Sequence, residues 1–324
     1  MPTPKTKYII LPFIVLCMNG SLWLEGTIYK TQGSLFLISH GENFWRNIFR
    51  VLNSYLRGST KRIDLEIRLN GQTHRVRSDK RGNFKLNLSC KEKDVVDLEQ
   101  LKVFLVKKDR KMRLGIPEPF NHCYFTYTDS PIGVVSDIDD TVLVTHTLNT
   151  FRKMRTLLVK NALRRKAVKK MKDFYQEFHH RGYPFFYVSN SESNLFPMIR
   201  LFLEHNHFPI GPVFLKPYVE WSQIFEKRKR QETGLHKKEK ITFLLNALPE
   251  MNFILIGDDS QKDPEIYAEL AHTFPGRIRE IYIRMVKHRV SSKRQILKSK
   301  VEESLDTNFI FFDDPEQILV RRVV

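Results

Sequence analysis

The feature that most constrains the fold is an alternation of short apolar runs with helical stretches after Pro131. Five such runs are rich in β-branched and aromatic residues: residues 132–135, 184–188, 253–256, 278–284 and 309–312. Continuous apolar strands separated by helices are typical of a parallel sheet that is covered by helices on both faces. Residues 131–324 are therefore predicted to form a three-layered α/β domain. In such domains ligands collect at the carboxyl ends of the strands.

The chain before this alternation has the pattern of short antiparallel strands. Period-2 alternation, or a strand–turn–strand pattern, occurs in residues 22–29, 63–69 and 76–88. The second of these runs leads into Asn70-Gly71, which is a strong hairpin signal. Residues 43–56 have the apolar spacing of a helix. We therefore expect a small β-sandwich domain over residues 1–130.

Composition and charge narrow the class of protein. A hydrophobic content of 41% and a charged content of 28% are typical of a soluble globular chain, and 324 residues suffice for two domains. The 54 basic and 36 acidic residues give a net charge of +18. This excess favours anionic partners such as phosphorylated metabolites, nucleic acid or an acidic membrane, although a merely solvated basic surface is the alternative. Three cysteines without metal-ligand spacing predict reduced thiols and a cytoplasmic setting.

The N-terminal segment leaves two interpretations open. Residues 8–18 are apolar and follow Lys5 and Lys7, as in a secretory signal peptide. The run is too short to span a membrane, contains Pro12 and precedes no small-residue cleavage site. We therefore expect a strand here, with a cleaved signal as the alternative.

Carboxylates follow the first apolar run of the α/β domain. Asp137 and Asp139 are two residues apart, so they would point the same way from a strand and repel each other without a counter-ion. A hard cation such as Mg²⁺, which prefers oxygen ligands, is the natural counter-ion. An acidic helix-capping turn is the alternative explanation.

Three further groups follow in chain order. Ser189 comes after the second run, where its hydroxyl can donate to a phosphate oxygen, and Lys237 opens a predicted helix, where its ammonium can neutralise a transferring phosphoryl group. Asp258 follows the third run after Gly257 and is expected to complete the metal site, with Asp259 or Asp263 orienting it. Each group has a helix cap or a solvated side chain as its alternative. Because these alternatives would have to hold for every group in this order along the chain, one shared site is favoured.

This ordered set resembles the four motifs of the haloacid-dehalogenase phosphatase superfamily. The matching segments are Asp137-Ile138-Asp139-Asp140-Thr141, Tyr187-Val188-Ser189-Asn190-Ser191, His236-Lys237, and residues 254–258 with Asp263-Pro264-Glu265-Ile266-Tyr267. They are similar to those of the actin-patch-type phosphatidate phosphatases and their bacterial relatives, a likeness that covers nearly the whole chain. Two departures are Asp140, where the superfamily usually has Gly, and Asp259-Ser260, where Ser-Gly often follows.

The resemblance implies a Mg²⁺-dependent phosphatidate phosphatase. Asp137 would then be the nucleophile that forms an aspartyl-phosphate, and Asp139 would protonate the leaving oxygen and later activate water. Mg²⁺ would be held by Asp137, the backbone carbonyl of Asp139 and Asp258, while Ser189 and Lys237 would hold the phosphoryl oxygens. The supporting residues implied around the metal are Asp259, Asp263 and Thr141, and Asn190 is implied as a substrate-binding residue.

A basic segment follows the first motif. Residues 142–172 contain no acidic residue, and their apolar positions have roughly helical spacing. A second basic run occupies residues 227–230. Basic amphipathic helices bind anionic membranes, so Arg164, Arg165 and Lys166 are expected to contact a phospholipid substrate. The alternative is a helix whose apolar stripe packs on the sheet while its cations are solvated.

Three questions about function stay open at this point. No recognised nucleic-acid motif accompanies the charge, so the expected partner is an anionic phospholipid, reached by peripheral membrane contact. The same chemistry on a nucleotide, sugar phosphate or phosphoprotein is one alternative, and a catalytically silent lipid-binding module is another. The presence of both Asp137 and Asp139 argues against a silent module. The oligomeric state has no signal in the sequence.

Overall fold

The computed structural model describes residues 6–18, 21–32, 62–69, 71–89, 101–107, 110–115, 125–126, 130–138, 162–216, 232–286 and 291–318. The helix expected at residues 43–56, the basic run at 227–230, and the residues Asp139 and Thr141 lie outside these ranges. The chain divides into two compact units: Met1–Thr128 with Asn194–Phe202, and Asp129–Ser193 with Leu203–Val324. Within the described ranges, no helix is both long and apolar enough to cross a membrane.

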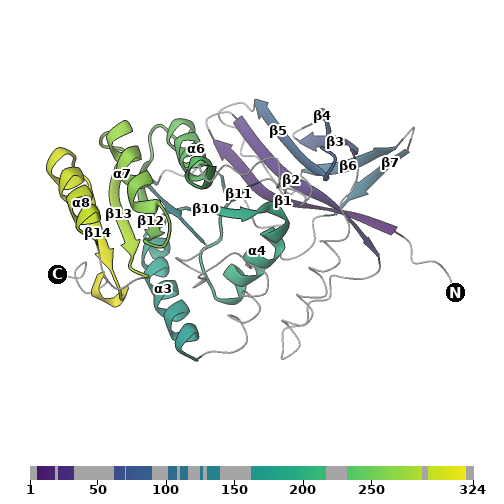
Figure 1. Ribbon diagram of the computed structural model, residues 1–324. Helices are drawn as coiled ribbons and strands as arrows, with labels where there is room; N and C mark the ends of the chain where they lie inside the picture. The colour runs from purple at the N-terminus through teal and green to yellow at the C-terminus, as the bar shows by residue number, and fades with distance from the viewer. Residues whose placement is uncertain are drawn as a thin grey trace. The chain divides into compact units, whose positions relative to one another are not determined.

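The first unit contains two four-stranded sheets (Figure 1). One has the order β5-β2-β1-β8 and the other β4-β3-β6-β7. Their strands are β1 (Thr6–Met18), β2 (Ser21–Gln32), β3 (Asp64–Leu69), β4 (Gln72–Arg77), β5 (Asn83–Ser89), β6 (Lys102–Lys107), β7 (Arg110–Leu114) and β8 (Phe125–Thr126). Only β1 and β8 pair in parallel among these described strands. The strand expected at residues 8–18 is confirmed, since these residues lie within β1.

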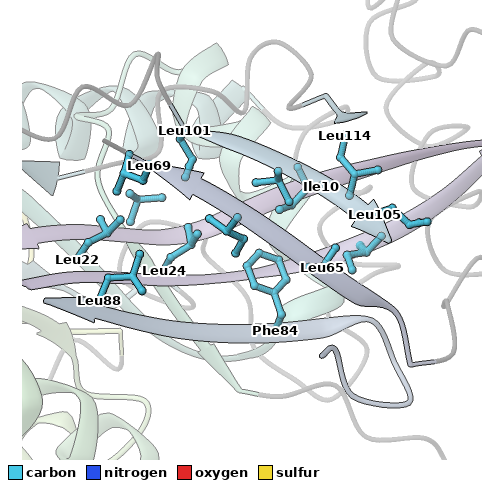
Figure 2. Packing of buried hydrophobic residues seen from close by; sticks show 14 residues of the cluster. Ile10, Leu22, Leu24, Leu65, Leu69, Phe84, Leu88, Leu101, Leu105 and Leu114 are labelled. Atoms are coloured by element: carbon cyan, nitrogen blue, oxygen red, sulfur yellow. The ribbon is translucent and has the colours of Figure 1, made fainter. Parts of the chain in front are cut away.

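Both sheets contribute side chains to one hydrophobic cluster (Figure 2). Leu22 and Leu24 come from β2, whereas Leu65 and Leu69 come from β3 of the other sheet. In β3 the apolar residues alternate with Asp64, Glu66 and Arg68, so one face of the strand points into the cluster and the other points away. This burial of apolar area explains the period-2 pattern in the sequence.

The connections of the first unit follow the turn signals only in part. Gly71 has φ +76°, and Leu69 pairs with Gln72 in the antiparallel register, so β3 and β4 form the expected hairpin with Gly71 in its turn. Residues 76–88 also contain two strand segments, as predicted. However, β4 and β5 belong to different sheets, so the intervening turn carries the chain from one sheet to the other.

The second unit is built on a six-stranded parallel sheet with the order β11-β10-β9-β12-β13-β14 (Figure 1). Its strands are β9 (Ile132–Ser136), β10 (Phe185–Glu192), β11 (Val213–Lys216), β12 (Asn252–Asp258), β13 (Ile278–Arg284) and β14 (Asn308–Phe312). The chain runs outward from β9 to β11, returns to β12 beside β9, and runs outward again to β14. Open α/β sheets bind ligands at such a reversal point. The reversal places the carboxyl ends of β9 and β12 next to each other.

The five strands predicted for this sheet are confirmed, and β11 is an additional one. Its sequence signal is weak because the strand has four residues and follows Gly211-Pro212. The helices of the second unit are α3 (Ala162–His180), α6 (Glu232–Ala247), α7 (Asp263–Thr273) and α8 (Ser292–Ser304), and η3 (Ser193–Leu195) and α4 (Phe196–His205) lie between β10 and β11.

Helices α3 and α7 cover opposite faces of this sheet. The ring of Phe174 in α3 packs edge-on against Tyr282 of β13, with centroids 5.4 Å apart. Gly257 of β12 pairs with Ile283, the next residue of β13, so Gly257 lies on the other face. A Cβ built on Gly257 would lie 2.9 Å from Tyr267 of α7. The expected layering of helices on both faces is therefore present.

Glu66 is a buried acid on the side of β3 that points away from the cluster. It is 1% exposed and accepts ion pairs from Arg68 and Lys111, each at 2.7 Å. The hydrogen bonds from Lys111 and Arg68 hold the pKa of Glu66 below its ordinary value. The charged form is therefore stabilised by folding.

Substituting Glu66→Gln is expected to lower the urea midpoint of unfolding at pH 7. Because the folded-state pKa is depressed, the stabilisation by Glu66 is present above the unfolded-state pKa and is lost as pH falls through the folded-state value. The urea midpoints of wild type and variant should therefore converge as the pH is lowered from 7 to about 3, below the ordinary carboxyl pKa of ~4. Asp64→Asn, on the same strand and 58% exposed, is the control and should change little. An equal deficit of the Glu66→Gln variant at both pH values would contradict this account.

Candidate active site

Three buried carboxylates meet at the edge where β9 and β12 end. Asp137 directly follows β9, Asp258 is the last residue of β12, and Asp263 is the first residue of α7. Each side chain is at most 1% exposed, and one carboxylate oxygen from each lies within 4.8 Å of the others. The neighbouring parallel strands bring Asp137 and Asp258 together although they are far apart in the chain.

Lys237 places a cation among these carboxylates. Its Nζ lies 3.1 Å from Oδ1 of Asp137 and forms an ion pair with Oδ1 of Asp263. Burial by itself lowers the pKa of this ammonium, but the charges of Asp137, Asp263 and Asp258 outweigh burial and raise the pKa above its ordinary value. The ammonium therefore stays charged. Lys237 lies inside α6 rather than at its start as expected, because the helix begins at Glu232.

The charge balance of the cluster fits a divalent cation. Three carboxylates and one ammonium leave two negative charges in a buried space. Burial, with the charge of Asp263, raises the pKa of Asp258 to about 6, and burial likewise raises the pKa of Asp263 to about 6 against the opposing effect of Lys237. A bound cation would favour the charged forms of these acids. All donors are oxygens, which suits Mg²⁺.

Hydrogen bonds hold the backbone of Asp137. Its N–H donates to the carbonyl of Ile256 at 2.8 Å, and its carbonyl accepts from Oγ of Ser136 at 2.7 Å. Because that bond uses the single proton of Ser136, the hydroxyl of Tyr175, 2.6 Å from the same Oγ, is the donor in their contact. Burial raises the pKa of Tyr175, so it stays protonated. The sequence offered no signal for this role of Tyr175, because it depends on how α3 docks on the sheet.

The loop after β12 links two of the acids. The N–H of Ser260 donates to Oδ1 of Asp258 at 2.6 Å, and the N–H of Asp258 donates to Oδ2 of Asp263 at 3.3 Å. Gly257 allows this close approach, since a Cβ at this position would lie 2.9 Å from Cβ of Asp263. Of the two acids proposed to orient Asp258, Asp263 is therefore the one placed beside it.

Asp259 points to a different set of partners. Its Oδ1 accepts from the N–H of Val286 at 2.7 Å. Arg294 of α8 donates to the carbonyls of Asp259 at 2.7 Å and of Gln261 at 2.9 Å. Asp259 and Arg294 thus brace the loop that joins Asp258 to Asp263. Arg294 has no sequence signal of its own, because it lies far along the chain in a helix with several other basic residues.

Ser189 and Asn190 lie within β10, which extends beyond the predicted strand. Ser189 is fully buried, and its Oγ accepts from the N–H of Ser191 at 2.9 Å. Nδ2 of Asn190 donates to Oε1 of Gln261 at 2.8 Å, which ties the end of β10 to the loop after β12. The expected contacts of Arg164, Arg165 and Lys166 are not among the described features, since only the backbone of these residues is described, as part of α3.

Comparisons with known proteins match the part of the chain that carries these groups. Residues 132–285, just under half of the 324 residues, match the family described as phosphatidate phosphatase APP1, catalytic domain. Phosphatidate phosphatase APP1 of Saccharomyces cerevisiae is 32% identical over 180 residues, which cover 55% of this chain and 30% of that protein. An uncharacterized protein of Schizosaccharomyces pombe is 29% identical over 157 residues, which cover 48% of this chain and 25% of that protein. The chain thus matches less than a third of the length of either relative.

A solved structure, that of a carbohydrate acetylesterase from Xanthomonas citri, aligns with 93% of this chain and 68% of its own, at 8% identity and a TM-score of 0.32. A TM-score this low supports no argument.

The second unit is an α/β domain with a buried acidic site at the carboxyl ends of parallel strands. The match to the APP1 phosphatidate phosphatase catalytic domain, over residues 132–285, includes the residues of this site.

Substituting Lys237→Met is expected to destabilise the metal-free protein by about 3–5 kcal/mol, because it leaves buried carboxylates without their cation. Added Mg²⁺ should recover part of this loss by binding the folded state. Urea unfolding with Mg²⁺ or with EDTA measures both effects. Lys238→Met is the control, since Lys238 is the next residue and forms an exposed ion pair with Glu269. Equal stability of the Lys237 and Lys238 variants would contradict the proposed charge balance.

Substituting Gly257→Ala is expected to weaken Mg²⁺ binding by roughly 10–100-fold, the range seen when supporting residues of metal sites are changed. The added methyl group must displace Asp263 or Tyr267. Calorimetric titration with Mg²⁺ measures the affinity. Gly115→Ala is the control, since a Cβ at Gly115 meets nothing within 4 Å. Unchanged affinity in a folded Gly257→Ala variant would show that the close approach to α7 does not shape the site.

Proposed function

We propose that the chain is a Mg²⁺-dependent phosphatidate phosphatase of the haloacid-dehalogenase type, which forms an aspartyl-phosphate on Asp137. The observation that carries this proposal is the gathering of Asp137, Asp258 and Asp263 around Lys237 at the edge where β9 and β12 end. The family match supports it, because all four residues lie within residues 132–285. The choice of phosphatidate as substrate follows the name of the yeast relative.

In the proposed reaction, a carboxylate oxygen of Asp137 attacks the phosphorus of the substrate. The bond between phosphorus and the diacylglycerol oxygen breaks, and Asp139 gives that oxygen a proton. Water, deprotonated by Asp139, then cleaves the aspartyl-phosphate and releases inorganic phosphate. Bound Mg²⁺, with Asp137 and Asp258 as ligands, would reduce the repulsion between the nucleophile and the anionic substrate.

The remaining residues position these groups. The buried ammonium of Lys237 is fixed by Asp263 and can stabilise charge on the transferring phosphoryl group. The Tyr175–Ser136 pair holds the backbone of Asp137 in place. Since positioning and electrostatic stabilisation dominate phosphoryl transfer, residues that are fixed in place suit this chemistry.

The proposal extends to the architecture and setting of the chain. We infer a β-sandwich over residues 1–130 and a haloacid-dehalogenase-like domain over residues 131–324. The cluster shared by two sheets supports the first, and the strand order around β9 and β12 supports the second. We infer a cytoplasmic setting from the small number of cysteines, and the excess of basic residues supports peripheral contact with an anionic membrane.

Substituting Asp137→Asn is expected to lower turnover by about 10⁴-fold or more, because an amide is a poor nucleophile and losing a nucleophile is among the most severe changes in a hydrolase. Phosphate release is measured from phosphatidate in vesicles and from a soluble aryl phosphate, with Mg²⁺ or with EDTA. Asp173→Asn is the control, since Asp173 is exposed on α3 and pairs with Lys172.

Two outcomes would overturn parts of this proposal. Turnover that survives Asp137→Asn would rule out Asp137 as nucleophile. Hydrolysis of the soluble ester without hydrolysis of vesicle-bound phosphatidate would rule out the lipid as substrate. Loss of activity with EDTA, restored by Mg²⁺, is expected in the wild type.

A further inference from the structure

The sheet β4-β3-β6-β7 has one face that points away from the hydrophobic cluster, here called the outer face. In β3, every second residue points into the cluster, namely Leu65, Ile67 and Leu69. The strand register therefore assigns Asp64, Glu66 and Arg68 to the outer face, together with the residues paired with them.

The outer face is strongly basic. Its basic residues, all exposed, are Arg68, Arg75, Arg77, Lys102, Lys111 and Arg113. Its acidic residues within the described strands are Asp64 and Glu66, so the formal net charge of the face is +4. These cations come from all four strands, so they are spread across the sheet rather than gathered on one edge.

Both acids of the outer face are already engaged by cations of the same face. Asp64 pairs with Arg77 at 3.2 Å, and Glu66 is buried beneath Arg68 and Lys111. Consequently, the described carboxylates of this face are used by three cations, while three further cations, Arg75, Lys102 and Arg113, extend the basic surface around them. The face thus presents positive charge to a partner.

An aromatic residue lies in the middle of this charge. Phe104 is half-buried, pairs with Glu66 on one side and Arg113 on the other, and carries the guanidinium of Arg68 at 4.8 Å from its ring centroid. Neighbouring strands are about 4.8 Å apart, so the four strands present a broad surface rather than a pocket. Cations around a partly exposed apolar side chain match a lipid interface, where phosphates lie above acyl chains.

We propose that the outer face binds anionic phospholipid head groups and holds the protein at a bilayer surface. The choice of a lipid over another polyanion rests on the proposed function, because phosphatidate lies in a membrane. This surface is distinct from the basic segment at residues 142–172. Each Lys or Arg at an anionic membrane contributes about 1 kcal/mol, or about fivefold in affinity, so three such residues contribute about 100-fold together.

The test compares a triple variant, Arg75→Gln/Lys102→Gln/Arg113→Gln, with a charge-matched control, Lys80→Gln/Lys293→Gln/Lys300→Gln, whose three lysines are exposed elsewhere. Binding is measured by co-sedimentation with phosphatidylcholine vesicles that contain phosphatidylserine, and with phosphatidylcholine alone. Phosphatidylserine carries no phosphomonoester, so this binding does not depend on turnover. Hydrolysis of a soluble aryl phosphate is measured for every variant.

Wild type and control are expected to bind the phosphatidylserine vesicles, and the triple variant about 100-fold more weakly, with binding of all three reduced by salt. Soluble-ester hydrolysis should be the same in all three. A double variant, Lys102→Gln/Arg113→Gln, should show an intermediate loss and guards against misfolding of the triple variant.

Vesicle binding by the folded triple and double variants that equals that of the control would overturn the inference. RNA binding is measured for the same variants. A triple variant that loses binding to RNA but keeps binding to vesicles would also overturn the inference, because it would assign the face to nucleic acid. Failure of the proposed function gives a different result: the wild type would not hydrolyse the soluble ester, while vesicle binding would still depend on the outer face.

Discussion

The site in the second unit depends on one constraint: three carboxylates are buried together with a single lysine. A buried ion pair is weak evidence for stability, because desolvation offsets most of the Coulomb attraction. Lys237 compensates only one of the charges, and burial, together with neighbouring carboxylates, raises the pKa values of Asp258 and Asp263. An arrangement that costs stability is typical of sites held for chemistry. The rest of the fold holds these charges close together and away from water.

The parallel sheet makes this possible at low geometric cost. Because β9 and β12 are neighbours, the residues that follow them are adjacent without any long loop. The α7 helix begins at Asp263, so the third acid lies on the sheet face where α7 packs against Gly257. Arg294 and Asn190 tie the connecting loop to α8 and β10, which limits the freedom of Asp258. Positioning is thus shared among elements from several parts of the chain.

Electrostatics shape the first unit in a different way. Its two sheets close around one apolar cluster, which leaves the opposite side of β4-β3-β6-β7 mainly to charged residues around Phe104. Glu66 is buried on that side because Arg68 and Lys111 cover it. There the acid is compensated by cations, whereas in the second unit the acids outnumber their cation. One unit is therefore suited to bind anions and the other to bind a cation.

Local patterns suffice to predict the strand periodicity, the hairpin at Gly71 and the order of Asp137, Ser189, Lys237 and Asp258 along the chain. That the Asp263 side chain, rather than the Asp259 side chain, contacts Asp258 follows from the packing of α7 against β12. Tertiary packing also accounts for β11, for the switch of sheets between β4 and β5, and for the roles of Tyr175 and Arg294. Each of these depends on which elements pack together, and the spacing of residues along one segment carries no information about a partner that lies far away in the chain.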